Sequence, residues 1–256
     1  MSVRIIAGPC QHESLDKSIK IAEHCYEVCK TYGFDYIFKA SYDKANRTHM
    51  DSKRGLGMKQ TLEDFHKIKA KVNCQTLTDV HDREQVKDIM REFSDCVDIL
   101  QIPAFLCRQT DLVVEACNTG KIVNIKKGQF LAPWDIKGIL SKCSGEVWVT
   151  ERGTSFGYNN LVVDFTGIQY MLNNFDNVVF DVTHSVQKPG GQGNSTGGNR
   201  EYIPGLSRAA AAMGVKSFFI ETHEDPDIAP SDGPNMVKLD KFEELIDGIY
   251  RHTNTR

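Results

Sequence analysis

The sequence predicts a single-domain (β/α)8 barrel, and three observations lead to that prediction. Eight short, nearly continuous apolar runs alternate with eight segments of helical periodicity along the 256 residues. Such runs are typical of parallel strands that are covered on both faces. Polar residues follow the strand ends, where barrel enzymes carry their active sites. An open doubly wound sheet, the rival fold, requires a glycine-rich phosphate turn after the first strand, and Gly8-Pro9-Cys10 is not such a turn.

The elements follow from local patterns taken in order. The first apolar run is stopped by Gly8 and Pro9, the first helix is expected to stop near Gly33, and Pro133 is suited to a helix start. The predicted strands cover residues 3–7, 35–40, 74–78, 97–102, 121–125, 146–150, 177–181 and 217–220. The predicted helices cover residues 15–32, 60–72, 83–93, 111–118, 133–143, 161–173, 200–213 and 239–251.

Composition limits the class of protein. With 40% apolar residues, the chain is long enough for one large core, so we expect one catalytic domain over residues 1–256. A net charge of -3 without a lysine-arginine run argues against nucleic acid or a membrane surface as the partner. We find no signal-peptide pattern and no transmembrane span, and the eight cysteines show no disulfide framework. A reduced, cytoplasmic protein is therefore expected.

Polar side chains follow every predicted strand. In any protein, a strand that reaches water can end in polar residues, so one or two such positions would mean little. Here all eight strand ends are polar and three of them carry cations, although the chain has a net negative charge, and this favours a binding site. In strand order the ends offer Cys10, Lys39, Asp79, His81, Gln101, Lys126, Glu151, Arg152, His184 and Glu221.

The basic residues among these indicate an anionic ligand. Lys39, Lys44, Arg47, Lys126 and Arg152 are expected to converge on one mouth, where they would match a substrate that carries phosphate and carboxylate groups. The glycine-rich stretch 185–199 is interpreted as a lid over this mouth rather than as a plain tether.

Barrel closure raises the question of a metal site. If the eighth strand pairs with the first, Cys10, His184, Glu221 and Asp232 become neighbours. This mixture of soft and hard ligands suits zinc, iron(II), manganese or cobalt. The residues alone leave a second interpretation open, in which Cys10 is an ordinary buried thiol and His184 a catalytic base.

Seven stretches, in order from residue 6 to residue 223, resemble the 3-deoxy-D-manno-octulosonate 8-phosphate synthase family. They are Ile6-Ala7-Gly8-Pro9-Cys10, Lys39-Ala40-Ser41-Tyr42-Asp43-Lys44-Ala45-Asn46-Arg47, Gln101-Ile102-Pro103-Ala104-Phe105-Leu106-Cys107-Arg108-Gln109, Asn124-Ile125-Lys126-Lys127-Gly128-Gln129-Phe130, Thr150-Glu151-Arg152-Gly153, Asp181-Val182-Thr183-His184-Ser185-Val186-Gln187 and Glu221-Thr222-His223.

The resemblance implies condensation of phosphoenolpyruvate with D-arabinose 5-phosphate and water, for lipopolysaccharide synthesis. It places the pentose phosphate at Asn46, Arg47 and Thr48, where this chain has threonine in place of the common serine. It implies a homotetramer in which Phe105 and Arg108 reach across a subunit boundary. The residues expected to hold phosphoenolpyruvate are Lys39, Lys44, Gln101, Lys126, Arg152 and His184.

The same resemblance implies the metal-dependent class. Members that need a divalent metal carry cysteine at the position of Cys10, and the others carry asparagine there. Cys10, His184, Glu221 and Asp232 are the expected ligands, and His184, Lys44 and Asp232 are expected to take part in catalysis.

Three rival functions remain. The nearest is the related 3-deoxy-D-arabino-heptulosonate 7-phosphate synthase, which uses erythrose 4-phosphate; its sugar-phosphate segment reads Lys-Pro-Arg-Thr, whereas residues 44–47 of this chain read Lys-Ala-Asn-Arg. A phosphosugar-binding regulator would be expected to lack a site residue or to carry an output domain. A thiol redox protein would need a resolving cysteine near Cys10, and the sequence has none in the same turn.

Overall fold

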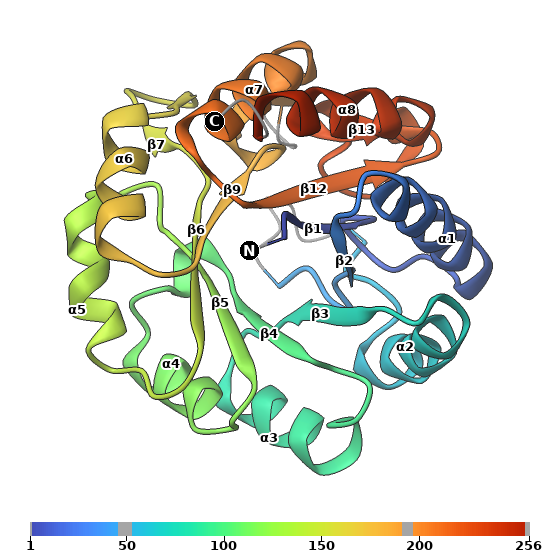
Figure 1. Cartoon of the computed structure of the whole chain (residues 1–256). Coiled ribbons are helices and arrows are strands. Elements are labelled where there is room, and N and C mark those ends of the chain that lie inside the picture. The colour runs from blue at the N-terminus through green and yellow to red at the C-terminus, as the bar shows by residue number, and fades with distance from the viewer. Residues whose placement is uncertain (1, 46–52, 191–196, 254–256) are drawn as a thin grey trace.

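The computed structural model describes residues 2–45, 53–190 and 197–253. Eight parallel strands close into a barrel, and helices form a ring outside it (Figure 1). The prediction of a (β/α)8 barrel is therefore confirmed. The barrel strands are β1 (Arg4–Gly8), β2 (Asp35–Lys39), β3 (Gln75–Asp79), β4 (Ile99–Ile102), β5 (Ile122–Lys126), β6 (Val147–Glu151), β9 (Val178–Asp181) and β12 (Ser217–His223).

The helices pack against the outer faces of these strands through one apolar face each. Helix α1 buries Ile21, Cys25 and Cys29 in the shell between the helices and the barrel, and Ser14 caps its first turn by accepting a hydrogen bond from the Lys17 N–H at 3.4 Å. Within the described residues the α-helices are α1 (Leu15–Thr31), α2 (Met58–Val72), α3 (Arg83–Glu92), α4 (Thr110–Cys117), α5 (Ile136–Leu140), α6 (Phe165–Asn174), α7 (Ile203–Met213) and α8 (Phe242–Thr253).

Two helices differ from the sequence prediction. The segment expected as a helix over 161–173 begins with strand β8 (Leu161–Val162), which pairs with β7 (Thr154–Ser155). Helix α6 begins only at Phe165, because Asp164 accepts hydrogen bonds from the Thr166 backbone and side chain. The segment expected as a helix over 133–143 is a 3-10 turn, Pro133–Asp135, followed by the single short helix α5.

The barrel closes through β1 and β12. Their parallel register runs from Arg4 opposite Ser217 to Gly8 opposite Glu221. Inside the barrel, a layer of buried apolar side chains from seven strands fills the lower part, and Arg4 stacks on the ring of Trp148 with its guanidinium carbon 3.9 Å from the ring centre. This layer consists of Ile6, Ile37, Leu77, Ile99, Trp148, Val179 and Phe219. Polar groups of the interior therefore gather above it, toward the carboxyl ends of the strands.

Part of the predicted lid is a short hairpin. Strand β10 (Gln187–Lys188) pairs antiparallel with β11 (Gly197–Gly198). Residues 191–196 lie outside the described residues, so the lid stays a prediction. None of the helices in the described ranges combines the length and apolar character needed to cross a bilayer.

Gly8 occupies a position where the backbones of β1 and β2 touch. A Cβ atom at Gly8 would lie 2.1 Å from the Lys39 carbonyl oxygen, so no side chain fits there. The close approach holds the end of β1, and therefore Cys10, beside Lys39.

We expect Gly8→Ala to lower the free energy of unfolding by about 1–3 kcal/mol, because the strands must move apart to admit the methyl group. Gly138→Ala is the matched control, since Gly138 lies in α5 with no atom within 4 Å of a built Cβ, and it should raise stability by about 0.5–1 kcal/mol. Urea unfolding followed by circular dichroism measures both; a Gly8→Ala variant as stable as the wild type would contradict the close approach.

Candidate active site

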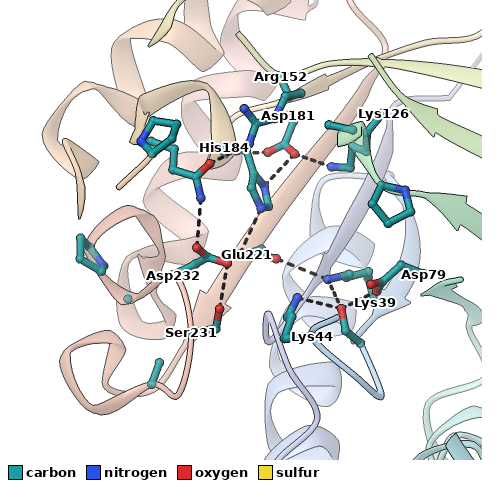
Figure 2. A pocket seen from close by; sticks show the side chains of 18 of the residues that line it. Lys39, Lys44, Asp79, Lys126, Arg152, Asp181, His184, Glu221, Ser231 and Asp232 are labelled. Atoms are coloured by element: carbon teal, nitrogen blue, oxygen red, sulfur yellow. Dashed lines mark hydrogen bonds and ion pairs between the residues drawn. The ribbon is translucent and has the colours of Figure 1, made fainter. Parts of the chain in front are cut away.

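A cavity of about 650 Å³ opens at the carboxyl ends of the barrel strands (Figure 2). Its size suits small-molecule substrates. The sequence-predicted residues that line it are Lys39, Lys44, Gln101, Phe105, Lys126, Arg152, His184, Glu221 and Asp232. The structure therefore brings the predicted cations and carboxylates to one mouth.

Barrel closure also places Cys10 at this site, beneath the cavity surface. The thiol is fully buried, and its Sγ donates a hydrogen bond to Asp232 Oδ2 at 3.0 Å. Burial and the nearby Glu221 carboxylate raise the pKa of Cys10 well above its usual range. Without a metal ion the thiol keeps its proton, which argues against a nucleophilic or redox role.

The donor set fits a divalent metal ion. One ligand atom from each of Cys10, Glu221 and Asp232 lies within 4.8 Å of the others. Glu221 Oε2 is buried without a hydrogen-bond partner in the described part of the chain, which is costly unless something else binds it. Figure 2 shows Glu221 between Asp232 and Lys39. Sulfur and oxygen donors together suit a borderline transition metal.

His184, the fourth predicted ligand, lies beside this group of three. Its Nε2 is 3.9 Å from Glu221 Oε2, and its Nδ1 is 2.8 Å from Asp181 Oδ2. A metal-bound histidine typically has its second nitrogen against a carboxylate, which is the arrangement that Asp181 provides. The ligand role of His184 stays a prediction.

Asp181, at the end of β9, is shared between two predicted site residues. Its carboxylate also forms a buried ion pair with Lys126, whose ammonium lies over the Phe219 ring, 3.1 Å from the ring centre. Burial lowers the pKa of Lys126 to about 8, although Asp181 opposes the shift. Burial would raise the pKa of Asp181, but His184 and Lys126 hold it well below its usual range. Asp181 therefore stays ionised and orients both partners.

Lys39 and Lys44 are held on the other side of the mouth. The Lys39 ammonium donates to the Cys10 carbonyl and the Ser41 hydroxyl, both at 3.1 Å, and lies 3.4 Å from Glu221 Oε1. Lys44 donates to the same hydroxyl at 2.8 Å, and Ser41 donates to Asp79. Ser41 thus accepts hydrogen bonds from both lysines and links them to the buried carboxylate of Asp79.

The carboxylates facing the cations remain charged. Burial would raise the pKa of Asp79, but the hydrogen bond from His81 and the charges of Lys44 and Lys39 keep it well below its usual range. Burial likewise opposes the shift at Asp232, where His184 and Lys44 lower the pKa to about 2. The mouth is therefore a set of paired charges into which an anionic ligand can insert.

Arg152 and Asp232 are joined through Gln187. Its side-chain oxygen accepts a hydrogen bond from Arg152 at 2.7 Å, and its amide nitrogen donates to Asp232 Oδ1 at 3.1 Å. Arg152 also donates to Gln129 Oε1 at 3.3 Å. These amides fix the direction of a guanidinium that is almost entirely buried.

Sequence reasoning assigned no role to Ser41, Asp181 or Gln187, and placed Asp79 and His81 only at a strand end. Asp181 carried a usable signal, because it is a charged residue directly after the apolar run Val178–Phe180. Ser41 and Gln187 carried none, since a hydroxyl or amide in a loop is ordinary.

The lining of the cavity does not account for all the predicted substrate residues. Asn46, Arg47 and Thr48 fall outside the described residues. Arg108 is exposed and does not line the cavity, whereas Phe105 stands at its rim with 53% of its surface exposed.

Residues 1–253 match the family model described as the DAHP synthetase I family. The chain belongs to this family. Among its relatives, a protein of Brucella canis is 52% identical over 249 residues, which cover 96% of this chain and 88% of the relative. A protein of Caulobacter vibrioides is 51% identical over 252 residues, 97% of this chain and 86% of the relative. Both are named 2-dehydro-3-deoxyphosphooctonate aldolase, another name for the enzyme family that the sequence resembles.

This member of the DAHP synthetase I family should bind anions less well as the pH rises through about 8, where Lys126 loses its proton. The sign follows from the charge: only the ammonium form attracts an anion. Sulfate stays a dianion throughout this range, so its titration by calorimetry reports on the protein alone.

The Lys126→Arg variant should lose this pH dependence, because a guanidinium stays charged. Lys69→Arg, at a lysine outside the cavity, is the control and should keep it. An unchanged pH dependence in Lys126→Arg would show that another group is responsible.

Proposed function

We propose that the chain is a 3-deoxy-D-manno-octulosonate 8-phosphate synthase, which condenses phosphoenolpyruvate with D-arabinose 5-phosphate and water in lipopolysaccharide biosynthesis. The observation that carries this proposal is a cavity lined by Lys39, Lys44, Lys126 and Arg152 in a chain that is 52% identical to a protein with this enzyme's name. Both substrates are anionic, which matches the charge of these four side chains. We propose residues 1–256 as one catalytic domain.

The cations position the enol phosphate. Arg152 offers two parallel N–H groups to a phosphate or carboxylate, and Lys126 and Lys39 add point charges from either side. Such fixed orientation of two reactants can supply about 7–11 kcal/mol of a barrier. Gln101 is held ready as a hydrogen-bonding group, since Asn124 donates to its side-chain oxygen at 3.0 Å.

Water must reach carbon 2 of the enol phosphate while carbon 3 attacks the sugar aldehyde. We propose that the ionised Asp232 carboxylate and His184 place this water, and that Lys44 balances the charge at the reacting groups. Asp232 suits the role because its pKa of about 2 keeps it a hydrogen-bond acceptor. The DAHP synthetase I family and the Cys10, Glu221 and Asp232 group both favour metal dependence.

We propose that Cys10, His184, Glu221 and Asp232 hold one divalent ion, which is zinc, iron(II), manganese or cobalt. When bound there, it would polarise the aldehyde oxygen of the sugar. We further propose a homotetramer, supported by the exposed Phe105 and Arg108, and a cytoplasmic location, supported by eight cysteines that are all free thiols.

The choice of aldose phosphate tests the proposed function. We expect turnover of phosphoenolpyruvate with D-arabinose 5-phosphate to exceed turnover with erythrose 4-phosphate by at least about 100-fold in kcat/KM, a difference that polar contacts to a substrate can supply. Phosphate release measured with each sugar in parallel gives the ratio. A preference for erythrose 4-phosphate would identify the heptulosonate synthase instead.

Chelation tests the metal proposal. Activity should be lost on treatment with a strong chelator and return with one of the four metals, because the proposed ion would be held only by side chains of the chain and a strong chelator competes with them for it. Cys10→Asn should lower bound metal, measured by elemental analysis, by at least about tenfold. Cys143→Ser, a thiol outside the cavity, is the control. Full activity in the chelated enzyme would refute metal dependence.

A further inference from the structure

Lys127 is a lysine with no access to solvent and no place in the cavity. It follows β5 directly, and its side chain is 0% exposed. The ammonium lies 3.4 Å from the carboxylate of Glu151, the last residue of the neighbouring strand β6, and that side chain is 3% exposed. Burying two charges is expensive, so a buried ion pair is weak evidence that the two residues serve stability.

Every group of this pair is satisfied by the two segments that leave β5 and β6. Lys127 Nζ donates to the carbonyls of Gly128 at 3.3 Å and Leu131 at 3.2 Å, and to the Thr154 hydroxyl at 3.3 Å. Glu151 Oε1 accepts the Gly153 N–H at 2.6 Å. The pair therefore ties residues 128–131 to residues 151–154.

The neighbours of this pair in the chain are two of the cations that line the cavity. Successive side chains of a strand point to opposite faces, so Lys126 faces the cavity while Lys127 faces away, and Arg152 faces the cavity while Glu151 faces away. The two strand ends are in register, because Lys126 lies opposite Thr150 and the Lys127 N–H donates to the Thr150 carbonyl at 2.8 Å. A change in the position of Lys127 relative to Glu151 therefore also changes the position of Lys126 relative to Arg152.

The same tie reaches the Arg152 side chain. Gln129, within the loop that Lys127 closes, accepts a hydrogen bond from Arg152 at 3.3 Å, and its carbonyl accepts the Ser155 N–H at 2.9 Å. The loop that supports the guanidinium is therefore anchored by the buried ammonium.

We propose that Lys127 and Glu151 are a positioning pair that sets the separation and direction of Lys126 and Arg152 for the anionic groups of phosphoenolpyruvate. The pair touches no substrate and acts through its neighbours. The inference rests on the proposed function, since it takes phosphoenolpyruvate as the ligand of the two cations.

Three variants separate positioning from stability. Lys127→Met leaves the Glu151 carboxylate buried and unpaired. Glu151→Gln removes the negative charge and keeps one acceptor oxygen. The double variant, Lys127→Met with Glu151→Gln, removes both charges. Lys69→Met is the matched control, because Lys69 binds Asp98 at 2.7 Å at the opposite end of the barrel, where β4 begins.

We expect Lys127→Met to be less stable and to raise the KM for phosphoenolpyruvate by about tenfold or more, with the KM for D-arabinose 5-phosphate within about twofold of wild type. The double variant should regain stability, because no unpaired buried charge remains, and should keep the raised KM. Lys69→Met should lose stability alone. Steady-state kinetics and urea unfolding give the two readouts; if Lys127→Met does not fold, the double variant and Glu151→Gln carry the comparison.

An unchanged KM for phosphoenolpyruvate in all folded variants would overturn the positioning role, as would a double variant whose KM recovers together with its stability. Calorimetric titration of phosphoenolpyruvate without the sugar separates the two proposals. A wild-type protein that binds phosphoenolpyruvate without turnover refutes the proposed function alone, and the variants then decide the positioning pair by binding. A wild-type protein that binds none refutes both.

Discussion

The pairing of β1 with β12 is the constraint on which the candidate site depends. Five residues of each strand lie in parallel register, and the pairing brings Gly8 opposite Glu221, which is 213 positions later in the chain. Cys10 follows the first strand and Asp232 follows the last, so their contact at 3.0 Å exists only in a closed barrel. The backbone contact at Gly8 adds Lys39 to the same corner. One closure thus assembles a thiol, two carboxylates and a cation from opposite ends of the chain.

The mouth above this corner is balanced by pairs of opposite charge. Lys126 shares Asp181 with His184, and Lys39 lies between the carboxylate of Glu221 and the Ser41 relay to Asp79. Low dielectric makes these attractions strong, and it makes an unpaired charge costly. The side chains are consequently held in place before any ligand arrives, which reduces the reorganisation that binding requires.

The sequence predicted the barrel and the strand-end cations because both follow from local patterns. An apolar run and its terminal polar residue are visible along the chain, and the fold then carries Lys39, Lys126 and Arg152 to one face. It could not reveal Ser41 or Gln187, whose importance lies in a contact with residues far along the chain, nor the buried setting of Lys127, which reads as a second lysine in a polar loop. The start of α6 was missed because Leu161 and Val162 fit helical spacing but pair as a strand. The spacing of apolar residues cannot show that another segment, here Thr154–Ser155, pairs with these two residues as a strand.

The apolar layer inside the barrel determines the route by which substrates, water and products reach and leave the cavity. Trp148, Phe219 and five aliphatic side chains fill the lower interior, and Arg4 lies across Trp148 beneath them. A packed layer of this kind leaves no channel for water from below. Substrates, solvent and products must all pass through the opening of the cavity at the carboxyl ends of the strands. Anything that narrows this opening therefore slows product release as well as substrate binding.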